Sequence, residues 1–435
     1  MTAPSVPASQ PTFERFLLPG NLELRINSNR KLKTILAKVY VAADLDLSVT
    51  ARALAPMVLR RGTENYPDMQ ALHRQMELLY GASIWSTVSK IGEWHVTRFQ
   101  LEVVNDQFLP GAEGLFEDSL RLFHERVFQP RLDGGQFLAD YVDQERESLR
   151  RSIESLIDEK SSYAAHRCIE EMCPNEAYRL GEQGRVEDLD AITPESLTAD
   201  YQSWMRSAPI SIYVAGDVDI EATRDMVANV FQASRGDGVN ELSAPPSPVP
   251  VGELRTVREK LDVLQGKLVM GFRHGVTYAH ESYEAMMLMN GILGSFSHSK
   301  LFQNVREKAS LAYSASSWLE KSKGMLFISC GIANENFERA RDISLEQVAA
   351  MQRGDISDEE IDSTRKTILS NNEMLEDSFS TLAAIDYIWG LHGRAFDLGE
   401  LRSRLVNVTR DDIVAAANRL EHDMVYFLHG DEGSE

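Results

Sequence analysis

The residues from His166 to Cys173 bring together several side chains of the kinds that bind metals. The run reads His-Arg-Cys-Ile-Glu-Glu-Met-Cys. On a helix, His166 and Glu170 share one face, whereas Cys168 and Cys173 point in other directions. The separation of the two cysteines also differs from the Cys-x₂-Cys spacing of structural zinc sites. Buried thiols usually act as small apolar groups, so we expect these cysteines to pack without a metal.

Arg306 and Tyr313 form a second pair with useful chemistry. Arginine offers several fixed N–H donors and tyrosine a phenolic donor, and both suit the carbonyl oxygens of an extended peptide. Taken alone, the residue types favour a salt bridge or helix cap for Arg306 and a half-buried strand position for Tyr313. Gly291 and Gly294, just upstream, either end a helix or form a loop that admits a peptide backbone. The residue types alone leave these alternatives open.

The sequence carries no recognisable catalytic motif. It has no His-Glu-x-x-His zinc motif, no nucleophile elbow and no Walker phosphate-binding loop. Five of the histidines form no pair with metal-ligand spacing, namely His73, His95, His274, His280 and His298. We therefore predict no catalytic residue, no metal site and no cofactor.

Composition restricts the class of partner. The chain has 435 residues, 43% of them hydrophobic, which is long enough for two domains. Its formal net charge of -21 argues against nucleic acid or an anionic membrane, because phosphate binding needs clustered lysine and arginine. We find no secretory signal, no membrane-spanning stretch and no disulfide framework among the three cysteines. We expect a cytoplasmic protein with no nucleic-acid or membrane partner.

A proline-rich segment divides the chain. Residues 233–259 include Ser-Ala-Pro-Pro-Ser-Pro-Val-Pro, a composition typical of an extended connector. We predict a first domain over residues 1–232, a linker over 233–259 and a second domain over 260–435.

The same pattern recurs on both sides of this linker. A helix that Thr193 caps precedes the strand-like run 210–217, and a helix that Thr409 caps precedes the run 424–431. Both runs end in Gly-Asp. The two halves are therefore predicted to close with the same helix and strand, which indicates an internal duplication.

A repeated hairpin supports the duplication. Tyr-x-Ala-Ser-x-Trp occurs at residues 80–85 and 313–318, and each copy leads through a turn to a strand-like run, at 94–103 and 325–332. Long amphipathic helical stretches, such as 137–172, lie between the hairpins and the closing strands. We predict an α+β protein of two homologous domains, each a sheet covered by helices on one face.

This order of elements resembles the insulinase/pitrilysin family of inverted zinc peptidases, in which two homologous α+β domains are joined by a linker. In the first half, the strand 33–41, the helix 48–60 and the run 78–82 follow the family order. In the second half, residues 290–295 and 299–314 resemble the signature of the family's second domain. The resemblance covers nearly the whole chain.

The family's zinc site is missing. Its His-x-x-Glu-His helix carries two zinc ligands and the general base, and in that register this chain has Ala53, Pro56 and Met57. A later helix normally supplies the third ligand, and Ser152 stands in that position. None of the four side chains can bind zinc in the usual way, and Pro56 should also kink its helix. The resemblance therefore implies a non-catalytic member.

The resemblance also implies a role for the second half. In active relatives the arginine and tyrosine that correspond to Arg306 and Tyr313 reach the substrate backbone near the zinc. The resemblance therefore implies that Arg306 and Tyr313 bind substrate, together with Gly291 and Gly294 of the same signature. In two-subunit members, one subunit carries the zinc while the other can supply this pair. Within the family, the sequence around Arg52 and Lys90 is similar to that of silent bacterial members associated with aminopentanol modification of elongation factor P.

Three functional hypotheses follow. The leading one is a non-catalytic subunit that pairs with a zinc-bearing homologous peptidase and binds a peptide or an unfolded protein. The second is an adaptor or scaffold, possibly of a homodimer, that works in a modification pathway without a protease partner. The third is an enzyme with an unrecognised site at His166, Cys168 and Cys173.

Overall fold

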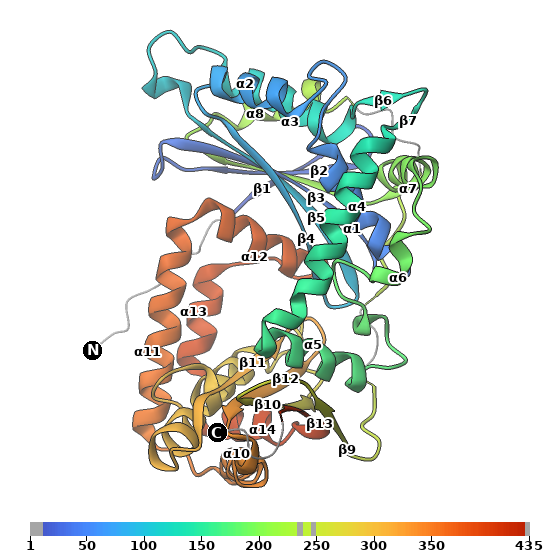
Figure 1. The fold of residues 1–435 in the computed structure, drawn as a ribbon. Helices are drawn as coiled ribbons and strands as arrows, with labels where there is room; N and C mark the ends of the chain where they lie inside the picture. Colours follow the sequence, from blue (N-terminus) through green and yellow to red (C-terminus); the bar gives the residue numbers. More distant parts are fainter. Residues whose placement is uncertain (1–11, 233–237, 245–248, 431–435) are drawn as a thin grey trace, which may run out of the picture.

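Two twisted sheets form the framework of the protein. We describe it from a computed structural model, which covers residues 12–232, 238–244 and 249–430. Figure 1 shows one sheet at each end of the molecule, with helices packed outside them and between them. None of the described helices is long and apolar enough to cross a membrane.

The first sheet has the strand order β1-β2-β8-β3-β5-β4. Its strands are β1 (Glu14–Leu18), β2 (Leu22–Ser28), β3 (Thr34–Asp44), β4 (Ser83–Ile91), β5 (Trp94–Val104) and β8 (Ile210–Gly216). The longest pairing is the antiparallel ladder of β3 with β5, from Thr34 opposite Val104 to Asp44 opposite Trp94. β4 is the edge strand next to β5.

Among the described residues, the first half has eight α-helices and one small hairpin. The helices are α1 (Val49–Leu59), α2 (Met69–Leu78), α3 (Leu115–Phe128), α4 (Ala139–Glu154), α5 (Lys160–Met172), α6 (Val186–Leu189), α7 (Pro194–Ser207) and α8 (Ile220–Val230). The hairpin pairs β6 (Leu132–Asp133) with β7 (Gln136–Phe137). The stretch predicted as one helix over 137–172 is thus two helices, with a 3₁₀ turn, Ser155–Asp158, between them.

The second sheet repeats the first. Its order is β11-β12-β10-β13-β9, with strands β9 (Arg255–Lys260), β10 (Gly266–Arg273), β11 (Ala312–Glu320), β12 (Met325–Ile332) and β13 (Glu421–His429). In the first sheet, β3 pairs antiparallel with β5 of the hairpin and with the closing strand β8, and β8 pairs parallel with β2. In the second sheet, β10 pairs antiparallel with β12 of the hairpin and with the closing strand β13, and β13 pairs parallel with β9. The predicted duplication is confirmed at the level of topology.

In the part of the second half that the structure describes, six α-helices accompany the sheet. They are α9 (Tyr283–Asn290), α10 (Phe337–Arg353), α11 (Asp358–Met374), α12 (Phe379–Leu391), α13 (Leu398–Asn407) and α14 (Arg410–Ala417), with π-helical segments at Gly291–Ser295 and Phe302–Lys308. The closing helices α7 and α14 begin as predicted, because Thr193 and Thr409 each form a capping box. Asp431, predicted to follow the last strand, lies outside the described residues.

β9 begins inside the segment predicted as a linker. Its backbone pairs parallel with β13, yet most of its side chains are exposed. A strand held mainly by backbone hydrogen bonds at a sheet edge shows little apolar alternation, so the sequence pattern did not reveal it.

Each sheet is also covered by a helix from the other half, which corrects the expectation that helices cover only one face. α5 of the first half packs on β10 and β13, where Cys168 and Met172 meet Val269 and Tyr426 in one buried cluster. Its counterpart α12 packs against β8 of the first sheet, and Tyr387 stacks on Tyr40 with ring centroids 4.1 Å apart. The two halves therefore exchange equivalent helices, and one buried cluster, which includes Tyr40 and Tyr387, contains residues of both halves.

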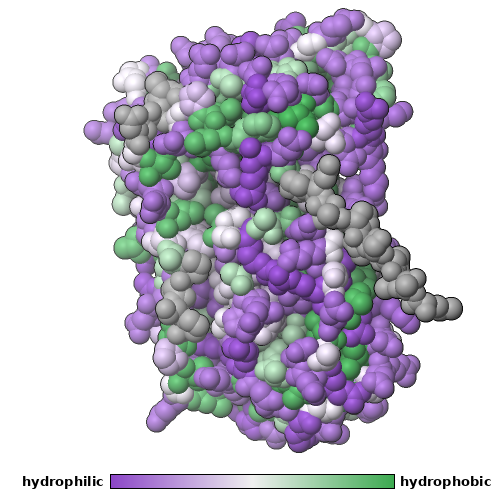
Figure 2. Space-filling model, turned by 180° about the vertical axis from the view of Figure 1, so that it is seen from behind, coloured by the Kyte–Doolittle hydropathy of each residue, from purple (hydrophilic) through white to green (hydrophobic). Residues whose placement is uncertain are grey.

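The hydrophilic character of the surface agrees with the formal net charge of -21. Figure 2 shows the face opposite that of Figure 1, where hydrophilic side chains predominate and apolar patches are scattered.

Candidate functional site

The positions that would hold zinc lie on two packed helices of the first half. α1 carries Ala53 and Pro56, both buried, and Met57, which is half-buried; α4 carries Ser152. A methyl group, a proline ring, a thioether and a hydroxyl take the places of two imidazoles and two carboxylates. In the described part of the chain, no three histidine, cysteine, aspartate or glutamate side chains are grouped so that they could hold a metal.

Pro56 lies within α1, which continues to Leu59 and ends with the cap residue Arg60. The proline thus removes one backbone donor without ending the helix.

One buried carboxylate, that of Glu145, lies on the same helix as Ser152, but two arginines already neutralise its charge. Glu145 on α4 is fully buried and accepts hydrogen bonds from Arg60 at 2.6 Å and from Arg61. The two arginines follow the end of α1, so the ion pairs hold α4 against α1. Glu145 is therefore a structural counter-ion.

The segment 178–188 packs across the start of α1 and the end of α4. The amide of Gln183 and the hydroxyl of Ser152 lie 3.0 Å apart, and Thr50 at the start of α1 donates to Asp188 at 2.9 Å. The Glu182 carbonyl of this segment also accepts a hydrogen bond from the buried ring of His95 on β5, at 2.9 Å. These contacts fix the segment across the ends of α1 and α4.

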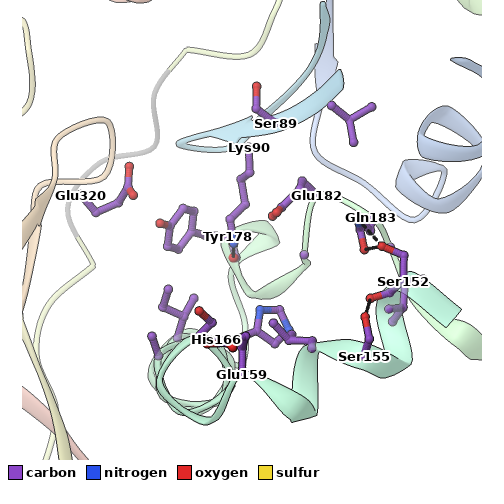
Figure 3. Close-up of a pocket in the computed structure, with 18 of the residues that line it drawn as sticks. Ser89, Lys90, Ser152, Ser155, Glu159, His166, Tyr178, Glu182, Gln183 and Glu320 are labelled. Carbon is purple, nitrogen blue, oxygen red and sulfur yellow. Dashed lines mark hydrogen bonds between the residues drawn. The ribbon is translucent and has the colours of Figure 1, made fainter. Parts of the chain in front are cut away.

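A cavity of about 790 Å³ opens beside Ser152. Its wall comes from the last residues of β4, the end of α4, one face of α5, the segment 178–184 and the end of β11. Figure 3 shows the polar side chains that line it, which include Ser89, Lys90, Ser152, Ser155, Glu159, His166, Tyr178, Glu182, Gln183 and Glu320. The cavity thus lies between the two halves, with an edge strand of each sheet in its wall.

Lys90 is the principal cation of this wall. Its ammonium donates to the carbonyls of Tyr178 at 2.8 Å and Leu180 at 3.0 Å, and lies 4.1 Å from the centroid of the Tyr178 ring. Burial lowers the pKa of Lys90. On the opposite side burial raises the pKa of Glu320, which hydrogen-bonds Tyr178. The cavity wall therefore includes a basic side chain, that of Lys90, and an acidic one, that of Glu320.

The tips of the two equivalent hairpins meet next to this cavity. Lys323, in the turn after β11, pairs with Glu93, in the turn after β4, at 2.6 Å, and with Glu176 at 2.8 Å. Gly92 lies so close to Ser322 that a β-carbon there would be 3.1 Å from the serine β-carbon. This junction fixes β4 and β11 on opposite sides of the cavity.

The cluster at His166 is a packing site. Cys168 and Cys173 are fully buried, and burial raises the pKa of both thiols, that of Cys173 to about 12. His166 lies 3.4 Å from Glu170 and lines the cavity, away from the thiols' core. Protonated buried thiols are poor nucleophiles and poor ligands.

Arg306 and Tyr313 lie at the surface of the second half. The Arg306 side chain is 44% exposed, with its guanidinium 4.6 Å from the Phe302 ring centroid and 3.8 Å from Glu307. Tyr313 is 77% exposed, because the β11–β12 register shifts between Ala312 and Ser314 and leaves Tyr313 in a bulge. Neither residue is part of the cavity wall, so the structure separates this pair from the Ser152 region.

Gly291 and Gly294 are buried in the π-helical segment after α9. A β-carbon on Gly291 would collide with the Thr364 methyl group, and one on Gly294 with the backbone nitrogen of Ser317 at 2.6 Å. Both glycines allow close packing of neighbouring elements, and contact with a peptide stays a prediction for them.

Sequence patterns did not single out the cavity residues Tyr178, Gln183 and Glu320. Lys90 was noted only for the similarity of the surrounding sequence to silent family members, and the sequence did not predict a cavity there. The one available signal was the repeated hairpin itself, because its two turns meet beside the cavity.

Comparison with known proteins gives consistent similarities. A family model described as the peptidase M16 inactive domain matches residues 191–368. The probable inactive metalloprotease YmfF of Bacillus subtilis is 38% identical over 95% of this chain and 97% of its own length. The uncharacterized zinc protease YmxG of the same bacterium is 26% identical over 42% of this chain and 44% of its own length.

Solved structures agree over the whole chain. The crystal structure of a conserved protein from Enterococcus faecalis V583 has a TM-score of 0.88 at 28% identity and covers 98% of this chain and 100% of its own. The peptidase M16 inactive domain from Pseudomonas fluorescens shares the fold, with a TM-score of 0.79 at 16% identity, covering 97% of this chain and 99% of its own.

Proposed function

Because this chain belongs to the insulinase (M16) family of metallopeptidases as an inactive member, we propose that it binds extended peptides without cutting them. In this proposal it is the silent subunit of a two-chain peptidase, and a homologue with an intact zinc site performs the hydrolysis. The observation that carries the proposal is a contrast within this chain: the positions of the zinc-binding side chains hold other residues, while the cavity between the two halves has an edge strand of each sheet in its wall.

The edge strands are suited to an extended peptide. Within the described ranges, β4 pairs only with β5 and β11 only with β12. The outer side of each strand therefore offers backbone N–H and C=O groups, which a peptide can satisfy by adding as a further strand. Backbone pairing of this kind tolerates many sequences, and the polar cavity wall supplies side-chain contacts at one end.

Arg306 and Tyr313 support the part of the proposal that concerns a second chain. Both are exposed, and a bulge directs Tyr313 away from its own sheet. Because they lie outside the cavity wall of their own chain, they are available to a peptide held between two chains. A structural role for Tyr313 would require more burial than it has.

The relatives are consistent with a pair of unlike chains. Bacillus subtilis has one protein named a probable inactive metalloprotease and another named an uncharacterized zinc protease, and both are similar to this chain. An inactive chain and a zinc-bearing chain of one fold can thus occur together in one bacterium.

Size-exclusion chromatography with light scattering tests the pairing. This chain is run alone, with the zinc-motif homologue encoded by the same genome, and with an unrelated zinc peptidase as control. We expect a 1:1 complex with the homologue only. A mixture that elutes as two separate species would contradict the proposal and favour the adaptor hypothesis.

A further inference from the structure

Backbone strain is concentrated where the two edge strands begin. In the described residues, three non-glycine residues have a left-handed backbone: Asn21 (φ 54°), Tyr80 (φ 55°) and Ser310 (φ 51°). Asn21 lies in the β1–β2 hairpin turn, where asparagine is well tolerated. Tyr80 and Ser310 come directly before β4 and β11, the strands that line the cavity. For tyrosine in particular this conformation is unfavourable.

Tyr80 occupies a position that glycine normally takes. α2 ends at Leu78 with Leu79 as its cap residue, and the N–H groups of Gly81 and Ala82 both return to the Met76 carbonyl. The left-handed residue after such a helix end is usually glycine, because a side chain there is strained. Burial does not compensate in this case, since Tyr80 is 53% exposed.

A strained, exposed aromatic residue suggests a ligand, since strain of this kind gathers at binding sites. Tyr80 stands at one end of β4, and Lys90 in the cavity wall stands at the other. With a rise of about 3.3 Å per residue, the strand between them spans about 30 Å. A peptide paired along β4 would need about nine residues to reach from the cavity to Tyr80.

We propose that Tyr80 is a peptide-binding residue at the outer end of β4, which grips extended peptides longer than about nine residues. Its ring packs on apolar atoms of the peptide and its hydroxyl donates to a peptide carbonyl. Tyr313, exposed at the outer end of β11, is placed in the same way in the other half. This inference rests on the proposed peptide-binding function and adds a length requirement to it.

The test uses the full chain and two pools of fluorescein-labelled degenerate peptides, one of five residues and one of twelve. Fluorescence anisotropy gives the binding of each pool, and thermal unfolding gives the stability of each variant. In Tyr80→Gly the strain is removed, so we expect a higher melting temperature. The same variant should bind the twelve-residue pool at least about fivefold more weakly and the five-residue pool unchanged.

Two further variants serve as controls. Tyr80→Phe keeps the ring and should retain most of the binding of the long pool. Phe108→Ala removes another exposed aromatic residue, 44% exposed and outside both edge strands, and should bind both pools like the unchanged chain.

Each possible result of these experiments bears on a different part of the proposal. Unchanged binding of the long pool by Tyr80→Gly would overturn the proposal and leave Tyr80 as a strained helix end. Equal weakening for both pools would overturn the placement at the far end of β4. If Tyr80→Gly instead impaired complex formation with the zinc-motif homologue, Tyr80 would be a partner contact. Failure of the unchanged chain to bind either pool would contradict the proposed function itself.

Discussion

At the residue scale, buried histidines make the fold sensitive to acid. Burial lowers the pKa of His95, His274 and His392 to about 4, whereas an unfolded chain titrates its histidines near 6.5. Between these values the unfolded state binds more protons than the folded state, so stability is lost as the pH falls from about 6.5 to about 4. Above about 6.5 the effect vanishes.

His95 allows a direct test, because its buried ring hydrogen-bonds the Glu182 carbonyl in the segment 178–188. We expect the free energy of unfolding of the unchanged chain to fall by about 2 kcal/mol more between pH 7 and pH 5 than that of His95→Gln. Glutamine can keep the donor to the carbonyl but does not titrate. Urea unfolding at the two pH values measures the difference, and equal losses would contradict the assignment.

The erased zinc site could be predicted from single residues, because its alignment needs only the order of elements around Ala53 and Ser152. The cavity beside it could not. Lys90, Tyr178 and Glu320 come from three distant segments, and none of them follows a periodic pattern. Their meeting depends on how the hairpin tips pack, which is a tertiary property.

At the scale of elements, the π-helical segment after α9 depends on glycine for close packing. A β-carbon on Gly291 would collide with the methyl group of Thr364 on α11. We expect Gly291→Ala to lower the free energy of unfolding by about 1–3 kcal/mol, the usual cost of overpacking.

A second substitution separates packing from other causes. Thr364→Ser removes the colliding methyl group while keeping the hydroxyl that contacts His298 at 3.1 Å. The double variant should therefore recover part of the stability that Gly291→Ala loses, as measured by urea unfolding. No recovery would show that Gly291 is required for a reason other than this contact.

The helices show where sequence patterns stop being informative. The N-caps at Thr193 and Thr409 depend on neighbouring residues only, and the sequence predicted both; the structure shows that each is part of a capping box. In α5, Ala164, Cys168 and Met172 form an apolar stripe, but a stripe does not tell which sheet it covers. The exchange of α5 and α12 between the halves was therefore visible only in the structure.

At the scale of the molecule, buried ion pairs join the two halves. Arg273 on β10 is 7% exposed and donates to Asp423 on β13 at 2.6 Å and to Glu176, from the first half, at 2.6 Å. Its guanidinium also reaches the Met172 carbonyl at 3.0 Å. Loss of the arginine would leave buried Asp423 without this cation, while Glu176 would keep its pair with Lys323.

We therefore expect Arg273→Leu to lower the free energy of unfolding by about 3–5 kcal/mol. Arg121→Leu, which breaks the exposed pair with Glu117, is the matched control and should change stability little. Chemical denaturation of both variants measures this. A similar, small effect in both would mean that the halves are held by helix exchange alone.

The most direct test of the account is a reconstituted peptidase assay. With zinc and an unfolded protein as substrate, kcat/KM is measured for this chain, for the zinc-motif homologue and for their mixture. We expect no activity from this chain and at least about a tenfold gain for the mixture over the homologue, which Arg306→Ala and Tyr313→Phe reduce. A homologue that is folded, zinc-loaded and equally active with or without this chain would contradict the account.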